Sequence, residues 1–517
     1  MTSTELLTRD FATLGALIRA HALERPEHVA MIEGERQLTY AALDRLVDRV
    51  AAALQHDAAA PRGCIAICAA SSIEYGVVFL GALRAGMAVS PLAPSSTAEQ
   101  LLVMLGDCGA DQLFVDAGAW KTLVPVAEKI AARRIALDDS AAGASFGAWL
   151  APLDARPQPV RIEPADPFNI IYSSGTTGAP KGIVQAHRMR WAHITRAVTT
   201  GYGPQAVTLV STPLYSNTTL VSFIPTLGLG GTVVLLAKFE AVAFLELAQK
   251  HRVTHAMLVP VQYRRIMELP QFERYDLSSF AMKYSTSAPF SAELKADVLK
   301  RWPGGLTEYY GMTEGGGTLV LYAHEYPDKL HTVGQPSPDH DIRLIGDDGR
   351  EVAPGEIGEV VGHSPGMMNG YHNQPQKTAE AEWYDQNGKR FIRTGDIGRF
   401  DEDGFLTLMD RKKDMIISGG FNIYPSDIEA VIVQHPAVLE AAVVGVASKR
   451  WGETPVAFVT PRHGVELNQE QLAAFVNARV GKTQRPSVYE IVESLPRSAI
   501  GKVLKRELRD GFKGIVA

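Results

Sequence analysis

Apolar runs of strand length alternate with helix-length segments through the first part of the chain. Residues 63–69 and 86–90 form two such runs, and a helical stretch lies between them. Residues 98–106 then have apolar side chains at helical spacing, with Thr97 as their cap, and residues 113–116 indicate the next strand. Strands that alternate with helices are typical of βαβ units, so this part of the sequence predicts a parallel sheet.

The same alternation returns between residues 206 and 259, where a helix over 241–251 separates the last two of three apolar strands. After about residue 330, short runs such as 341–345 and 358–361 are separated by Asp-Asp-Gly and Pro-Gly turns, which predicts an antiparallel, barrel-like region. From about residue 412 onward, β and α elements alternate over a length typical of a small separate domain.

The composition of the 517 residues excludes several classes of protein. A net charge of −6 gives no general basic field, so no nucleic acid partner is predicted. The three cysteines do not indicate a disulfide framework, and Cys64 and Cys68 are expected to be small buried hydrophobes. No uncharged run reaches the ~18 residues of a membrane helix. Residues 1–19 lack the pattern of a signal peptide, so a cytoplasmic location is expected.

Hydroxyl residues and glycines cluster where an apolar strand ends, in the segment Ile171-Tyr-Ser-Ser-Gly-Thr-Thr-Gly-Ala-Pro-Lys-Gly182. Glycines let backbone N–H groups turn toward an anion, hydroxyls add donors, and the lysine adds positive charge. The spacing differs from the G-x4-G-K-[ST] of a Walker A loop. The segment therefore predicts a phosphate-binding loop of another kind. Its candidate ligands are Ser173, Ser174, Gly175, Thr176, Thr177, Gly178 and Lys181.

Four further segments follow this loop along the chain. They are Tyr309-Tyr-Gly-Met-Thr-Glu314, Arg393-Thr-Gly-Asp396, Asp410-Arg-Lys-Lys-Asp414 with the glycine-rich stretch after it, and Pro496-Arg-Ser-Ala-Ile-Gly-Lys502. With the loop, these segments resemble the acyl-adenylate-forming superfamily, which contains acyl-CoA synthetases, aryl- and coumarate-type CoA ligases, peptide-synthetase adenylation domains and luciferases. The N-terminal part also resembles the family's first βαβ region, so the likeness covers nearly the whole chain.

The resemblance implies a two-domain α/β fold with a nucleotide site. The large N-terminal domain, residues 1–411, would contain two βαβ subdomains plus a distorted β-barrel. The small α+β C-terminal domain, residues 412–517, would be mobile, with a hinge near Lys413. Glu314 would help to hold Mg²⁺, a hard cation that prefers carboxylates, and Asp396 would accept hydrogen bonds from the ribose hydroxyls. Further residues that the resemblance places against ATP or AMP are Ser287, Ala288, Pro289, Tyr310, Gly311, Thr313 and Arg411.

Lys502 resembles the lysine that bridges the substrate carboxylate and the α-phosphate in this family. A mobile cation there would stabilise charge in the adenylation transition state. By the same resemblance, Lys502, Thr313 and Glu314 are the catalytic residues, and Gly419 and Gly420 border the channel for the pantetheine arm of coenzyme A. The expected cofactors and co-substrates are ATP, Mg²⁺ and coenzyme A.

The acid itself is less well defined by the sequence. The segment Ser211-Thr-Pro-Leu-Tyr-Ser-Asn217 matches the stretch that lines the acyl pocket in relatives, but Tyr215-Ser216 stands where many of them have an aromatic-His pair. No Asp stands near this position to pair with a substrate amine, which argues against an amino acid. An aryl, aryl-propenoic or medium-chain acid is therefore favoured over acetate. The predicted acyl-pocket residues are Tyr215, Ser216, Asn217, Thr286, Gly311, Gly315 and Gly316.

The reaction implied is an ATP-dependent carboxylic acid–CoA ligation. Acid and ATP would give acyl-AMP and pyrophosphate, and coenzyme A would then give acyl-CoA and AMP. Three alternatives stay open: a free-standing enzyme that loads an acyl carrier protein, a luciferase-like oxidase, and a binding protein with an inactive nucleotide site. The expected partners are the small-molecule acid, ATP and CoA, and a homodimer stays open.

Overall fold

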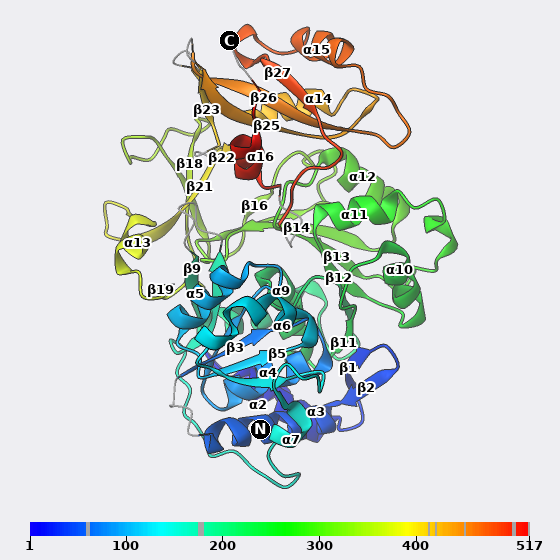
Figure 1. Ribbon diagram of the computed structural model, residues 1–517, viewed down its shortest axis with the longest axis vertical. Helices are drawn as coiled ribbons and strands as arrows, with labels where there is room; N and C mark the ends of the chain where they lie inside the picture. The colour runs from blue at the N-terminus through cyan, green and yellow to red at the C-terminus, as the bar shows by residue number, and fades with distance from the viewer. Residues whose placement is uncertain are drawn as a thin grey trace. The chain divides into compact units, whose positions relative to one another are not determined.

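The computed structural model of the protein describes residues 1–57, 63–173, 180–411, 414–418, 421–448, 451–498 and 503–514. The chain forms two compact units, and Figure 1 follows their elements by colour. The first unit comprises Met1–His331, Pro336–Asp341 and Gly362–Ile392. The second comprises Thr332–Gln335, Ile342–Val361 and Arg393–Ala517.

One sheet of the first unit has eight strands in the order β19-β9-β8-β4-β3-β5-β6-β7. The part from β8 to β7 is parallel, whereas β9 and β19 extend it in antiparallel fashion. The strands are β3 (Cys64–Cys68), β4 (Ala88–Pro91), β5 (Gln112–Val115), β6 (Arg133–Ala136), β7 (Ala144–Ser145), β8 (Pro167–Ser173), β9 (Lys181–Ala186) and β19 (Gly370–Tyr371).

A nine-stranded sheet has the order β16-β15-β14-β13-β12-β10-β11-β1-β2. Its central strands from β14 to β1 are parallel, and the N-terminal strand β1 pairs with β11 through Met31 and Val233. The strands are β1 (Val29–Glu33), β2 (Arg36–Thr39), β10 (Val207–Val210), β11 (Thr232–Leu235), β12 (His255–Leu258), β13 (Met282–Ser285), β14 (Gly305–Gly311), β15 (Thr318–Tyr322) and β16 (Gln335–Pro336).

Helices pack on both of these sheets and start at residues that can cap them. Thr97 accepts a hydrogen bond from the Gln100 N–H, and the Gln100 side chain accepts one from the Thr97 N–H, which together form a capping box. Figure 1 shows α10, α11 and α12 beside strands β12 to β14. The helices of the first unit are α1 (Ser3–Leu7), α2 (Leu14–Glu24), α3 (Tyr40–His56), α4 (Ile73–Arg84), α5 (Ala98–Cys108), α6 (Ala117–Leu123), α7 (Phe146–Trp149), α8 (His187–Ala197), α9 (Asn217–Gly228), α10 (Ala241–Lys250), α11 (Pro260–Met267), α12 (Ala292–Arg301) and α13 (Pro375–Glu380).

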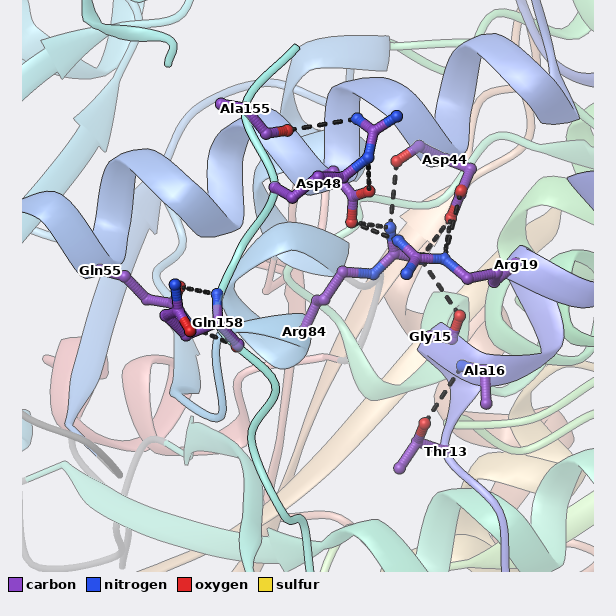
Figure 2. A network of polar contacts seen from close by, with 11 residues as sticks. Thr13, Gly15, Ala16, Arg19, Asp44, Asp48, Gln55, Arg84, Ala155 and Gln158 are labelled. Carbon is purple, nitrogen blue, oxygen red and sulfur yellow. Dashed lines mark hydrogen bonds and ion pairs between the residues drawn. The ribbon is translucent and has the colours of Figure 1, made fainter. Parts of the chain in front are cut away.

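A largely buried arginine, Arg84, connects the three N-terminal helices α2, α3 and α4 (Figure 2). Arg84 Nη1 donates to Asp48 Oδ1 at 2.8 Å, and Arg84 Nη2 lies 2.6 Å from Asp44 Oδ1. Arg84 Nη2 also donates to the Gly15 carbonyl oxygen at 3.1 Å, and Arg19 pairs with both aspartates. Only 3% of the Asp48 side chain is exposed, and the paired positive charges offset the cost of removing its carboxylate from water.

A third sheet has the order β17-β18-β21-β20, with β22 paired to β21, and a fourth has the order β24-β23-β26-β25, with β27 paired to β26. Glu429 of α14 accepts a hydrogen bond from the Val443 N–H and pairs with Lys505 of α16, so it links helices to the fourth sheet. The elements are β17 (Asp341–Ile345), β18 (Gly358–His363), β20 (Glu382–Tyr384), β21 (Arg390–Phe400), β22 (Leu406–Arg411), β23 (Ile416–Ser418), β24 (Phe421–Ile423), α14 (Pro425–Ile432), β25 (Val438–Ser448), β26 (Gly452–Pro461), α15 (Gln469–Asn477), β27 (Val488–Ile491) and α16 (Lys505–Gly511).

The predicted fold class is confirmed: the chain is α/β, with parallel sheets in its large N-terminal part and a small C-terminal α+β part. Cys64, Cys68 and Cys108 are buried free thiols, as expected for small apolar side chains. No helix in the described ranges combines the length and apolar character needed to cross a bilayer.

Candidate active site

The predicted phosphate loop connects two antiparallel strands of the first sheet. Ser173 ends β8, Lys181 begins β9, and the two residues are Cα partners in the ladder. The ladder therefore places both ends of the loop side by side. The remaining candidate ligands lie outside the described residues and stay predictions: Ser174, Gly175, Thr176, Thr177 and Gly178.

The residues predicted to contact adenine emerge from two neighbouring parallel strands. Ser285 at the end of β13 is the Cα partner of Glu308 in β14, so Ser287 and Tyr310 each follow two residues farther on. Ser287 has φ = +80°, a left-handed conformation that is uncommon for a residue with a side chain. Such backbone strain concentrates at functional sites, and ligands of parallel sheets bind at the carboxyl ends of the strands. Ala288 and Pro289 continue from this strained residue.

The predicted acyl-pocket segment is held beside the same strand end. Ser216 caps α9, because its Oγ accepts a hydrogen bond from the Thr218 N–H at 3.3 Å. The Thr218 hydroxyl in turn lies 2.6 Å from the Ser287 hydroxyl. The segment with Tyr215, Ser216 and Asn217 therefore borders the strand end that carries Thr286 and Ser287.

A chain of contacts links Lys181 of the phosphate loop to Glu314. Lys181 Nζ lies 5.0 Å from the centre of the Tyr371 ring, and the Tyr371 hydroxyl donates to Glu314 Oε1 at 2.8 Å. Burial raises the pKa of Tyr371 well above its ordinary value, and the Glu314 carboxylate raises it further, so this phenol stays a donor. Beside it, the Thr313 carbonyl oxygen accepts a hydrogen bond from Gln185 Nε2 at 2.6 Å.

The surroundings of Glu314 fit a magnesium ion that is held mainly by phosphates and water. Glu314 is half-buried. Its Oε1 accepts the hydrogen bond from the Tyr371 hydroxyl, and its Oε2 has no hydrogen-bond partner within the described ranges. Over those ranges, no group of three or more His, Cys, Asp or Glu side chains is arranged to hold a metal. Mg²⁺ commonly takes one or two carboxylates and completes its shell with water and substrate phosphates.

Close chain packing accounts for two of the glycines predicted to border the acyl pocket. Gly315 has φ = +75°, and a Cβ added there would lie 2.2 Å from the Gly366 carbonyl oxygen. A Cβ at Gly316 would lie 2.6 Å from Ile392 Cβ. At Gly311 the nearest atom to an added Cβ would be the Gly317 carbonyl oxygen, at 3.1 Å. Neighbouring backbone and core atoms thus leave no room for a side chain at position 315 or 316. The role of these glycines in the acyl pocket stays a prediction.

In the second unit, two residues predicted to contact the nucleotide are neighbours in a β ladder. Asp396 of β21 is the Cα partner of Arg411 in β22, which brings the third and fourth sequence segments together. The Asp396 N–H donates to the Thr394 hydroxyl at 3.0 Å. Arg393 makes a two-bond contact with Glu359, with Nη2 to Oε2 at 2.6 Å. This contact orients the turn that carries Asp396.

The segment that carries Lys502 is closed at its base. Arg497 pairs with Val503, and the Leu504 N–H donates to the Pro496 carbonyl oxygen at 2.8 Å. Four predicted residues of the second unit lie outside the described part of the chain, and their roles stay predictions: Lys413, Gly419, Gly420 and Lys502.

Sequence reasoning missed Tyr371 and Gln185, the two side chains that hold Glu314 and Thr313. Tyr371 belongs to the two-residue strand β19, which pairs with β9 through Ile183. Gln185 lies in β9 itself, with its side chain turned toward Thr313. This pairing and the hydrogen bond from the Met368 N–H to the Glu314 carbonyl oxygen bring residue 371 to residue 314. The local sequence around Tyr371 gives no signal for either contact.

Comparison with known proteins identifies the family. The profile of the AMP-binding enzyme family matches residues 18–372, and that of the AMP-binding enzyme C-terminal domain matches residues 427–502. The chain belongs to the AMP-binding enzyme family. It is 33% identical to an indoleacetate–CoA ligase from Aromatoleum aromaticum, over 96% of this chain and 97% of that protein. It is also 33% identical to a feruloyl-CoA synthase from an Amycolatopsis species, over 96% and 99% of the two chains.

Another relative differs in its named acceptor. The fatty acid–[acyl-carrier-protein] ligase ScoC from Streptomyces coeruleorubidus is 33% identical, over 96% of this chain and 95% of that protein. Among solved structures, ATP-bound MatB from Rhodopseudomonas palustris matches with a TM-score of 0.88 and 27% identity, over 97% and 99% of the two chains. The family and fold predicted from the five segments are therefore confirmed.

Proposed function

We propose that the protein is an ATP-dependent carboxylic acid–CoA ligase that forms an acyl-adenylate and then an acyl-CoA. The observation that carries this proposal is the contact chain from Lys181 through Tyr371 to Glu314. It joins the predicted phosphate loop to the carboxylate that we propose for Mg²⁺. The named activities of the CoA-ligase relatives support the same reaction.

In the first step, the substrate carboxylate attacks the α-phosphorus of ATP, and pyrophosphate leaves. The protein's contribution is to position the groups and to neutralise charge. We assign Lys181 and the hydroxyls of the loop to the phosphates, Thr313 to the α-phosphate and Glu314 to Mg²⁺. Lys502 would bridge the carboxylate and the α-phosphate. Asp396 would hold the ribose hydroxyls, and Arg411 would contact the ribose or a phosphate.

In the second step, the thiol of CoA attacks the acyl carbonyl as a thiolate, and AMP leaves. We propose that residues 412–517 rotate about a hinge near Lys413 between the two steps. This rotation would withdraw Lys502 and bring Gly419 and Gly420 to the pantetheine arm. An aryl, aryl-propenoic or medium-chain acid is the proposed substrate, and the cytoplasm is the proposed location.

The direct test is one mass-spectrometric assay of enzyme, Mg-ATP and CoA with a pooled panel of aryl, aryl-propenoic and straight-chain acids. The expected product is an acyl-CoA that is absent when CoA is omitted, together with AMP. Formation of acyl-adenylate and AMP without acyl-CoA would indicate that the acyl acceptor is a carrier protein and not CoA, in line with the ScoC relative. If no acid of the panel caused release of pyrophosphate, the proposed ligase activity would be contradicted.

A tyrosine substitution tests the proposed magnesium carboxylate. Tyr371→Phe removes the hydrogen bond that fixes Glu314 and keeps the ring beside Lys181. A hydrogen bond to a charged group contributes about 1.5–3 kcal/mol, so we expect kcat/KM for Mg-ATP to fall about tenfold or more. The measurement is the rate of adenylate formation over a range of Mg²⁺ and ATP concentrations.

Tyr384→Phe is the matched control for this substitution. The Tyr384 hydroxyl also donates to a carboxylate, Glu382, at 2.8 Å, but the side chain is exposed and Glu382 is not a predicted site residue. Adenylation by Tyr384→Phe should match that of the unaltered enzyme. Equal losses in the two variants would show that Tyr371 does not act through Glu314.

A further inference from the structure

Among the described residues, a buried arginine of the first unit has only neutral hydrogen-bond partners. Arg190 lies on α8 with 1% of its surface exposed. Its guanidinium donates to the side-chain oxygens of Asn169 at 3.0 Å, Asn217 at 3.0 Å and Gln185. Burial lowers the pKa of this guanidinium well below its ordinary value, because the charge is removed from water without an anion nearby.

Three more basic side chains accompany Arg190, and the four are called the basic cluster below. His193 Nδ1 lies 3.4 Å from Arg190 Nη1. Arg196, on the same helix, has its guanidinium carbon 5.7 Å from the centre of the Tyr309 ring. Burial lowers the pKa of His193 well below its ordinary value, and the charges of Arg190, Arg196 and His340 lower it further. His340 completes the cluster, because it bonds to Thr318 of β15, the strand that pairs with the Tyr309-bearing strand β14.

The two arginines of the basic cluster lack carboxylate partners among the described residues. Within the described ranges, neither Arg190 nor Arg196 forms an ion pair with a carboxylate, and their polar and ring contacts are with neutral groups and with His193. Asp339 raises the pKa of its neighbour His340, but burial and Arg196 outweigh it and lower that pKa to about 4. Buried charges are normally paired or bound to a counter-ion.

Contacts of the basic cluster reach two parts of the proposed acyl pocket. Arg190 bonds to Asn217 of the pocket segment. His340 Nδ1 accepts a hydrogen bond from the Thr318 N–H at 2.8 Å, and Thr318 is the Cα partner of Gly311.

The chain also limits how far this cluster lies from the proposed reaction centre. Tyr309, which contacts Arg196, precedes Thr313 by four residues. At ~3.3 Å per extended residue, their Cα atoms lie at most about 13 Å apart. This is the scale of a small organic acid whose reacting carboxylate is at Thr313.

We propose that the basic cluster binds an anionic oxygen, a carboxylate or an ionised phenol, at the end of the acid that is far from its reacting carboxylate. The inference rests on the proposed function and narrows its substrate to acids with a second acidic group. Arg196 and His193 are half-buried and can approach such a group, whereas the amide partners of Arg190 fix its position. The bound oxygen would accept charge-assisted hydrogen bonds that the arginines do not make to any described carboxylate.

The test compares acids of equal length that differ only at the far end. Para-carboxy, para-hydroxy and para-methyl phenylpropenoic acids form one set, and octanedioic and nonanoic acids form a second. We expect kcat/KM for adenylation to be at least about tenfold higher with the acidic group than with methyl, because buried polar groups reject a partner that leaves them unpaired. Preference for para-carboxy over para-hydroxy would identify a carboxylate as the ligand, and the reverse an ionised phenol.

Two variants of α8 show whether this preference comes from the basic cluster. Arg196→Met should reduce the ratio of kcat/KM between the acidic and the methyl acids by about tenfold. Arg188→Met is the control, since Arg188 lies on the same helix but donates to Asn369. Arg196 is only half-buried, so this variant avoids the folding defect expected of Arg190→Met.

Calorimetric titration of the same acids into the enzyme, without ATP, separates this inference from the proposed function. Tighter binding of the acidic member, lost in Arg196→Met, would support the subsite even if no adenylate formed. Adenylation of methyl and acidic acids with equal kcat/KM would overturn the subsite and leave the ligase intact.

Discussion

Replacing Lys502 by alanine is expected to slow acyl-adenylate formation by about 10²–10³-fold, with far less effect on thioester formation from supplied acyl-adenylate. Loss of one donor that is aimed at charge in a transition state costs about 3–4 kcal/mol. The two half-reactions separate because the proposed rotation withdraws Lys502 before CoA attacks. The measurement is the pre-steady-state rate of each half-reaction.

Lys513→Ala is the control, because Lys513 is an exposed lysine of the same C-terminal region. It should leave both half-reactions unchanged. If Lys502→Ala slowed both half-reactions equally, this lysine would not have the proposed specific role in adenylation.

Replacing Lys295 by methionine is expected to destabilise the first unit by about 3–5 kcal/mol. Lys295 of α12 forms an ion pair with Glu308 of β14, and their side chains are 2% and 5% exposed. Burial raises the pKa of Glu308, and Lys295 opposes this shift. Without the lysine, the buried carboxylate keeps its desolvation cost and loses its counter-charge. The measurement is urea unfolding followed by the fluorescence of the buried Trp302.

Two further variants define this effect. Lys250→Met breaks an exposed pair with Glu35, where 52% and 92% of the two side chains are exposed, and should cost at most about 1 kcal/mol. The double variant Lys295→Met with Glu308→Leu should regain much of the lost stability, because no unpaired charge remains buried. If Lys295→Met lost no more stability than Lys250→Met, the proposed role of the Lys295–Glu308 pair would be contradicted.

The fold could be predicted because its signals are local. The capping box at Thr97 and the apolar runs that became β3, β4 and β5 depend on neighbouring residues alone. The phosphate loop was likewise placed at a strand end, where Ser173 and Lys181 pair. Contact of these residues with ATP remains a prediction.

The rest of the site depends on pairing over long distances. Tyr371 meets Glu314 because β19 joins β9, and Arg190 meets Asn217 because α8 packs near the start of α9. Neither contact has a periodicity or composition signal, since the partners are 57 and 27 positions apart. Arg190 would be read from sequence as an ordinary helix-surface charge.

The place of β1 in the nine-stranded sheet affects how the protein can fold during synthesis. Met31 pairs with Val233, about 200 residues later, while β3 to β6 find their partners within the intervening chain. At ~5–20 residues per second, a ribosome needs roughly 10–40 s to produce this stretch. Throughout that time the β1–β2 hairpin has an unpaired apolar edge, so it is a part of the nascent chain that a chaperone would need to shield.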